Sequence, residues 1–267
     1  MPLRSPNRGP ADIAGPPTSI RRKQRRFPLN AAARGRRDGI ARLRKTAIIR
    51  PTRRRALAIE RPILDLERLR AAPLHRDPFE FIIVEDFLDR AWMAALVADF
   101  PRVDGHGSYP LEVLSPGPSM AGLAAELTAP ALREAVEEKF GVVLEARPTM
   151  ITVRGRSDGK DGRAHTDSET KIVTLLLYLN PQWPAETGRL RLLRGPENLA
   201  DYVAEVPPLA GTMVAFRRSG RSWHGHRAHV GERRVVQLNW VTDAGVVRRE
   251  TGRHRWSARL KALSPFA

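Results

Sequence analysis

The sequence predicts a mainly β protein, a sandwich or barrel with flanking helices, and three observations support this fold class. Between residues 149 and 241, short apolar runs alternate with Gly, Pro and Asp, as strands alternate with turns. Two segments with helical spacing precede these runs. No segment repeats at a period of 20–50 residues, which argues against a solenoid or a propeller. With 42% apolar residues in 267, the chain can bury a sizeable core.

The first 60 residues differ in composition from the rest of the chain. They hold 17 Lys and Arg against three acidic residues, and so carry most of the formal net charge of +17. Because Pro and Gly interrupt this segment and no hydrophobic period runs through it, we expect a disordered tail over 1–60. The tail could bind nucleic acid through phosphate contacts. A solvated extension without a partner is the simpler interpretation.

Composition excludes several classes of site and location. The chain has no cysteine, so a disulfide framework and a thiolate metal site are impossible, and any metal must use His, Asp or Glu. Its longest apolar run is far shorter than the roughly 20 residues that span a bilayer. No apolar stretch follows the basic N-terminus as a secretory signal requires. We therefore expect a cytoplasmic protein with no membrane partner.

We expect the folded domain to span residues 78–243. It begins with a predicted strand at 79–84, and a helical pattern follows Glu85 and Asp86. Apolar residues at helical spacing predict a second helix over 124–140, which Gly141 ends. Five further strands are predicted, at 149–154, 171–179, 190–193, 212–216 and 234–241. Residues 244–267 form a basic C-terminal extension that we expect to pack on the surface.

His165 and Asp167 form the first part of a candidate metal site. In extended backbone, residues i and i+2 project from the same face, so both side chains can reach one ion. The pair follows a turn-rich loop over 158–162 and precedes the apolar run at 171–179, which places it at the edge of a strand. Among seven histidines such a pair also arises by chance, as an exposed loop histidine beside an exposed aspartate.

His224 supplies a third candidate ligand. It follows a predicted turn and strand over 211–216, and so arrives at the start of another β element. Two histidines and one carboxylate leave several coordination positions of a metal open, as in non-haem Fe(II) oxygenases. His226 lies only two residues further on and is an alternative to His224.

Arg234 is the candidate anion-binding residue. On the predicted strand 234–241 it shares a face with Val236, Leu238 and Trp240, so we expect it to point inward. An inward guanidinium needs an anion, and a carboxylate held by two hydrogen bonds satisfies it. An internal salt bridge is the structural alternative. Arg233 falls on the opposite face and is expected to be exposed, although it remains an alternative for this role.

Taken in order, these residues resemble a known family. Residues 78–243 resemble the 2-oxoglutarate and Fe(II)-dependent dioxygenases, in particular the prolyl 4-hydroxylase-like branch. The resemblance is carried by a series of motifs: His165-Thr-Asp167, 174–180, 188–190, 211–216, His224 and a basic residue ten positions later. Two features depart from the family pattern, namely the additional histidines at 226 and 229 and the absence of the usual proline before the basic position.

The resemblance implies a fold, a cofactor set and an activity. The fold is a double-stranded β-helix, the cupin-like jelly roll. His165, Asp167 and His224 would bind Fe(II), and Arg234 would hold the distal carboxylate of 2-oxoglutarate, with Thr174 and Tyr178 near the keto acid. The implied reaction uses O2 to hydroxylate a substrate C–H bond, coupled to decarboxylation of 2-oxoglutarate to succinate and CO2.

The sequence leaves the substrate and two other functions open. The substrate would be a small molecule or a protein side chain, and the segments 105–119 and 183–187 are the candidates for choosing it. A cupin-like metal protein with other chemistry is the first alternative. The second is a nucleic-acid-binding protein that acts through its basic tail.

Overall fold

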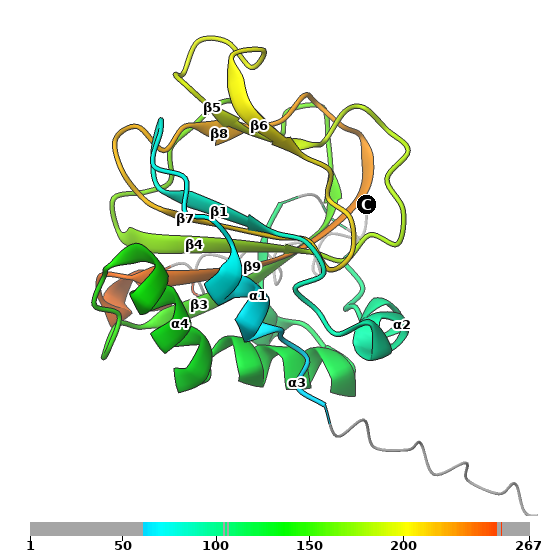
Figure 1. The fold of residues 1–267 in the computed structure, drawn as a ribbon. Coiled ribbons are helices and arrows are strands. Elements are labelled where there is room, and N and C mark those ends of the chain that lie inside the picture. The colour runs from blue at the N-terminus through cyan, green and yellow to red at the C-terminus, as the bar shows by residue number, and fades with distance from the viewer. Residues whose placement is uncertain (1–60, 104, 106, 250–251, 253–267) are drawn as a thin grey trace, which may run out of the picture. The chain divides into compact units, whose positions relative to one another are not determined.

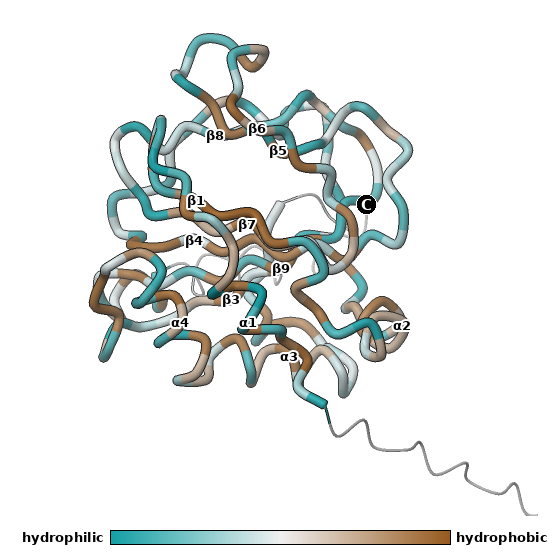
Figure 2. Tube along the Cα trace, viewed as in Figure 1, coloured by the Kyte–Doolittle hydropathy of each residue, from teal (hydrophilic) through white to brown (hydrophobic). Residues whose placement is uncertain are grey.

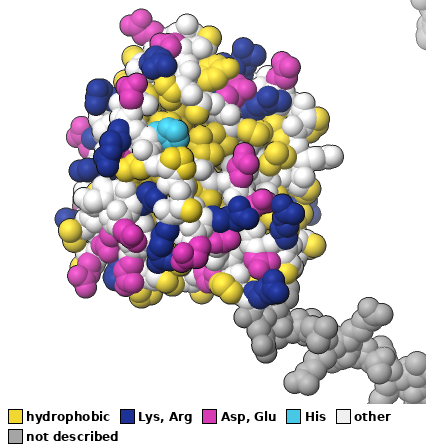
Figure 3. All heavy atoms as spheres, in the orientation of Figure 1, with side chains coloured by type: hydrophobic (Ala, Val, Ile, Leu, Met, Phe, Trp, Pro, Cys, Tyr) yellow, Lys and Arg dark blue, Asp and Glu magenta, His cyan; other side chains and the backbone are white. Residues whose placement is uncertain are grey.

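The computed structural model describes residues 61–103, 105, 107–249 and 252. The predicted tail over 1–60 and most of the C-terminal extension, 250–251 and 253–267, lie outside the described residues. In the described part, no helix is both long and apolar enough to cross a membrane. On the face shown in Figure 3, basic and acidic side chains are interspersed.

The named elements of the fold are nine strands and five helices, and residues 244–249 are also helical. The strands are β1 Phe81–Val84, β2 Tyr109–Pro110, β3 Thr149–Ser157, β4 Lys171–Tyr178, β5 Leu190–Leu193, β6 Tyr202–Val206, β7 Met213–Arg217, β8 His224–Gly225 and β9 Gly231–Val241. The helices are α1 Leu66–Ala71, α2 Arg90–Ala98, the 3-10 helix η1 Leu111–Val113, α3 Pro118–Leu127 and α4 Pro130–Phe140.

These elements form three layers (Figure 1). A six-stranded sheet in the order β1-β7-β4-β9-β3-β2 lies in the middle, and a three-stranded sheet in the order β6-β5-β8 lies over one of its faces. Helices α1, α3 and α4 lie on the other side of the larger sheet. All strand pairs are antiparallel. The two facing sheets are those of the predicted double-stranded β-helix.

The central strands β4 and β9 are buried on both faces, because each face meets a different layer. Leu175 of β4 and Leu238 of β9 are register partners, and both belong to the core under the helices. Tyr178 and Val235 are also register partners, but they belong to a second core between the two sheets. In Figure 2 most of β4 has the hydrophobic colour. Fully burying one such leucine contributes roughly 1.5–3 kcal/mol, so both layers help to hold these strands.

The predicted helix over 124–140 is two helices. Proline has no backbone N–H, so Pro130 is suited to the first turn of α4 and ends any continuous helix from α3. Gly141 closes α4 as predicted, in the left-handed conformation at φ 60°, and its N–H donates to the Glu137 carbonyl at 2.9 Å.

The fold begins earlier than residue 78. Ile63, Leu64 and Leu69 are buried in the main core, so the predicted start was too late. The carboxylate of Glu126 in α3 accepts the backbone N–H groups of Ile63 and Leu64 at 2.9–3.0 Å. These apolar residues have no clear period in the sequence, and a contact from 62 residues away holds them in place. At the other end, Val246 of the predicted extension is also buried.

Candidate metal centre

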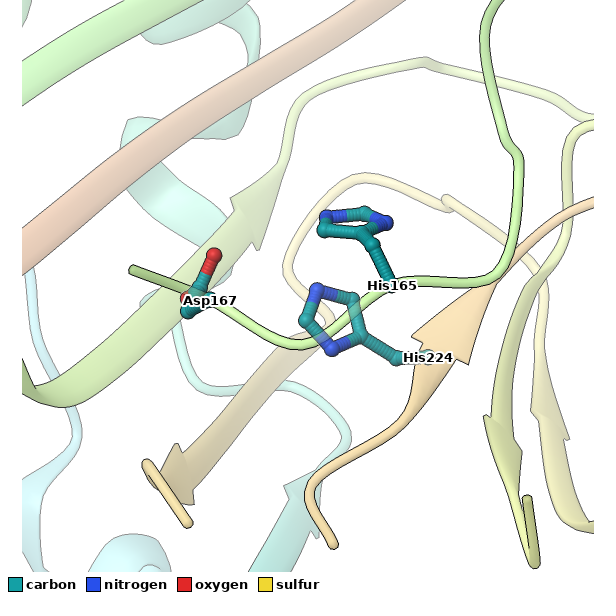
Figure 4. A group of neighbouring side chains, drawn as sticks. All are labelled: His165, Asp167 and His224. Carbon is teal, nitrogen blue, oxygen red and sulfur yellow. The ribbon is translucent and has the colours of Figure 1, made fainter. Parts of the chain in front are cut away.

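His165 and His224 are brought together by their backbones. The His165 N–H donates to the His224 carbonyl at 3.0 Å, and the His224 N–H donates to the His165 carbonyl at 2.9 Å. This isolated antiparallel bridge joins the segment before β4 to β8, which is held in the smaller sheet by β5. The two imidazole rings lie with their centroids 4.3 Å apart. The bridge therefore places both side chains on one side of the backbone (Figure 4).

Asp167 completes a group of three ligands. One ligand atom from each of His165, Asp167 and His224 lies within 4.8 Å of the others, and in the described residues this is the one cluster of its kind. Figure 4 shows the carboxylate beside the two rings. Asp167 and His224 are buried, whereas His165 is exposed. Two histidines and one carboxylate within this span are a ligand set for non-haem Fe(II).

Hydrogen bonds set the tautomer of both histidines. The Nδ1 atom of His165 lies 2.9 Å from the Arg163 carbonyl, and that of His224 lies 3.0 Å from the Ser222 carbonyl. A carbonyl oxygen can only accept, so each Nδ1 carries the proton and each Nε2 has a free lone pair. The donor set thus fits a divalent metal without rearrangement of its protons.

The local electrostatics favour the protonation states that a metal requires. Burial lowers the pKa of His224 to about 4, against the opposing charge of Asp167, so the ring is neutral at pH 7. Burial alone raises the pKa of Asp167, but the Lys171 ammonium, His224 and the Thr174 hydroxyl lower it below its usual value. Neutral imidazole and ionised carboxylate are the metal-binding forms.

The three ligands line a cavity of about 640 Å³ between the two sheets. Its walls come from β3, β4, β9 and the loop over 160–163, and they include Ser108 from the segment 105–119. The other candidate segment, 183–187, does not line the cavity; Trp183 instead packs against His229 with ring centroids 4.6 Å apart.

The prediction that Arg234 points into the site is wrong, because Arg233 takes that place. Arg233 is 6% exposed and lines the cavity, whereas Arg234 lies outside it. The Arg234 side chain donates to the Val97 carbonyl at 3.1 Å and forms an ion pair with Glu232. Val236, Leu238 and Trp240 do share one face of β9, as predicted, but this face packs against the helices and not against the site. The opposite face, which looked exposed in the sequence, faces the smaller sheet and the site.

Arg233 and Tyr178 lie together on the cavity side of the larger sheet. The guanidinium Nε donates to the Gly188 carbonyl at 2.9 Å, and its central carbon lies 5.5 Å from the centroid of the Tyr178 ring. Tyr178 is fully buried and is not among the residues that line the cavity, and its hydroxyl interacts with the Arg233 guanidinium. Burial raises its pKa, so it remains a neutral donor. A buried guanidinium with no ion-pair partner in the described residues can bind a carboxylate.

Two further predicted residues, Thr174 and His226, lie in the cavity wall. Thr174 lines the cavity and donates to Asp167, whereas His226 lines it without joining the ligand group. Lys171, Gln237 and Asn239 also line the cavity, and sequence reasoning missed all three. For Gln237 and Asn239 the signal was two amides among the apolar residues of 235–241, since a buried amide requires partners.

Residues 151–242, about a third of the chain, match the sequence profile of the 2OG-Fe(II) oxygenase superfamily. This segment is similar to the 2OG-Fe(II) oxygenases. The matched segment contains all three candidate ligands and Arg233. No curated protein sequence matches the chain.

Several solved structures are similar to this chain. A prolyl-4-hydroxylase from Pseudomonas putida is 24% identical, with a TM-score of 0.48 over 67% of this chain and 93% of the other. A prolyl 4-hydroxylase from Phytophthora capsici is 19% identical, with a TM-score of 0.48 over 72% and 70%. HygX from Streptomyces hygroscopicus, with nickel and 2-oxoglutarate bound, is 15% identical, with a TM-score of 0.45 over 68% and 88%.

Proposed function

We propose that this oxygenase holds Fe(II) through His165, Asp167 and His224, and 2-oxoglutarate through Arg233 and Tyr178, to hydroxylate a C–H bond of its substrate. One observation carries the proposal: a two-histidine, one-carboxylate group shares its cavity with a buried guanidinium that has no ion-pair partner in the described residues. A keto acid of this kind would bind the metal at one end and the guanidinium through its distal carboxylate at the other end.

Different side chains of the cavity would bind different parts of the keto acid. Iron, when bound, supplies the oxidation chemistry with O2 at its open coordination positions. Arg233 and Tyr178 offer N–H and O–H donors to the distal carboxylate, and Leu176, Leu190 and Val235 line the same cavity as an apolar wall for the methylene groups. Burial of the guanidinium strengthens its attraction for a carboxylate, because little water competes.

The buried arginine also favours an oxygenase over a cupin-like protein with other chemistry. A metal site without a dicarboxylate cosubstrate has no use for an unpaired buried cation, which is costly to keep. The substrate that we propose is a small molecule or a protein side chain, presented to the open side of the cavity. The basic tail lies outside the described residues and is not required for this chemistry.

Succinate formation tests the proposal. Purified protein with Fe(II), O2 and 2-oxoglutarate is expected to release succinate, at least slowly and without substrate, and Asp167→Ala is expected to abolish it. Asp201→Ala, which changes an exposed aspartate outside the cavity, is the matched control. Absence of both succinate and 2-oxoglutarate binding in the wild-type protein would refute the proposed function.

A further inference from the structure

A chain of three side chains ends on the Asp167 carboxylate. The Thr174 hydroxyl donates to Oδ2 of Asp167 at 2.5 Å, and Nδ2 of Asn239 donates to the Thr174 Oγ1 at 2.8 Å. Nε2 of Gln237 in turn donates to Oδ1 of Asn239 at 2.9 Å. Thr174 and Asn239 are buried almost completely, at 1% and 0% exposed. Their hydrogen bonds therefore replace water and cannot be exchanged for it at low cost.

The pairing of β4 with β9 creates this chain. Thr174 and Asn239 are register partners on the two neighbouring strands, and Gln237 lies two residues before Asn239 on the same face. Arg233 lies on that face as well, further along β9. One face of β9 thus carries the candidate anion-binding residue Arg233 near one end. Near the other end it carries Gln237 and Asn239, which lead to the metal ligand Asp167.

The direction of the hydrogen bonds is determined by the carboxylate. An ionised carboxylate only accepts, and a threonine hydroxyl has one proton. Because Asn239 donates to Oγ1, the Thr174 proton goes to Asp167 and to no other acceptor. Gln237 donates to Oδ1 of Asn239 and so keeps the Asn239 amide nitrogen directed at the Thr174 hydroxyl. A reversed amide would leave two acceptor oxygens facing each other.

The two oxygens of Asp167 have different partners. Lys171 Nζ lies 2.9 Å from Oδ1, and this lysine side chain is 17% exposed, whereas Oδ2 meets the buried and neutral Thr174. A neutral donor orients a carboxylate without cancelling the negative charge that attracts a cation. We propose that Thr174, Asn239 and Gln237 form a positioning relay that orients Asp167 for metal binding.

Fe(II) affinity, measured anaerobically by titration, tests the relay. Thr174→Val keeps the side-chain shape but removes the hydroxyl, and it is expected to raise the Fe(II) dissociation constant roughly 10–100-fold, the usual cost of losing an outer-shell partner. Thr174→Ser restores the donor and is expected to restore the affinity. Thr212→Val, a buried threonine outside the cavity, is the matched control. The melting temperature of the metal-free variants separates loss of the relay from loss of the fold.

Asn239→Leu tests whether the chain acts as a unit. It is expected to weaken Fe(II) binding in the wild-type background, where Asn239 directs the hydroxyl proton, and to have no further effect in Thr174→Val. The KM for 2-oxoglutarate at saturating Fe(II) is expected to stay unchanged in every variant, which separates a positioning role from contact with the keto acid.

Three results would overturn the relay: wild-type affinity in Thr174→Val, no recovery in Thr174→Ser, or equal effects of Asn239→Leu in both backgrounds. Because this role rests on the proposed function, the wild-type protein provides the separate check. Failure of the wild-type chain to bind Fe(II) would refute the iron site itself, whereas wild-type binding with an unaffected Thr174→Val variant would refute only the relay.

Discussion

Arg233 and Arg234 are neighbours in the sequence but face opposite layers of the protein. Arg233 lines the cavity and lies over the buried Tyr178 ring, whereas Arg234 reaches the Val97 carbonyl at the helix-covered side. Consecutive residues of a strand alternate between faces, so a shift of one position changes the environment of a side chain completely.

This alternation predicts different outcomes for the two arginines. Arg233→Gln removes a buried charge partner of the keto acid, which typically costs 2–5 kcal/mol, and should raise the KM for 2-oxoglutarate by about 30-fold or more. Arg234→Gln should leave that KM close to the wild-type value. Steady-state succinate formation measures both. A stronger effect of Arg234→Gln would show that Arg234, the residue predicted from the sequence, binds the keto acid.

The third ligand can be tested against its neighbour. His224→Ala is expected to abolish measurable Fe(II) binding, because it removes one of three protein ligands. His226→Gln should retain Fe(II) binding, since His226 is outside the ligand group and its Nδ1 lies 2.9 Å from the Arg227 carbonyl. Metal content after anaerobic loading and desalting distinguishes the two. Loss of iron in His226→Gln alone would reverse the assignment.

Gly162 is expected to be essential for the loop that leads to His165. It adopts φ +92°, and an added Cβ would lie 2.4 Å from both the carbonyl oxygen and Nδ1 of His226. Gly162→Ala should therefore displace the loop and lower both Fe(II) affinity and thermal stability, with strain of about 1–3 kcal/mol.

Gly159 provides the control for this prediction within the same loop. An added Cβ there would meet only Val230, at 4.0 Å. Gly159→Ala is expected to bind Fe(II) and to melt like the wild-type protein. Equal behaviour of the two alanine variants would show that the loop accommodates a side chain at Gly162.

The metal-free protein should lose stability as the pH falls from about 6.5 to 4. Burial lowers the pKa of His224 and of His226 to about 4, from the ordinary histidine value of 6.5. Below 6.5 the unfolded chain therefore takes up protons that the folded chain does not, which favours unfolding, and this effect ends once the folded-state pKa is passed. Melting temperatures measured across this range should fall with pH, and His226→Gln should show a shallower slope. A flat profile in the wild-type protein would contradict the buried, neutral state of both rings.

Much of the site was predictable because its residues are distinctive types at short spacing. The pair His165 and Asp167 needs only the geometry of extended backbone to share a face, and that pair is part of the candidate ligand group. The strand at 190–193 was predicted with the bounds that the structure shows. Residues 63–69 were missed because their burial depends on contacts such as the one with Glu126, which no local pattern reveals.

The sequence by itself determined the fold class, the absence of thiolate ligands and the three candidate metal ligands, since residue chemistry and local periodicity are sufficient for these. Only the tertiary structure decided which arginine enters the cavity and which side chains support Asp167. Periodicity divides a strand into two faces, but β9 is covered by helices on one face and by a second sheet on the other. Which of two covered faces holds the site depends on how the layers pack, and that information lies in long-range contacts.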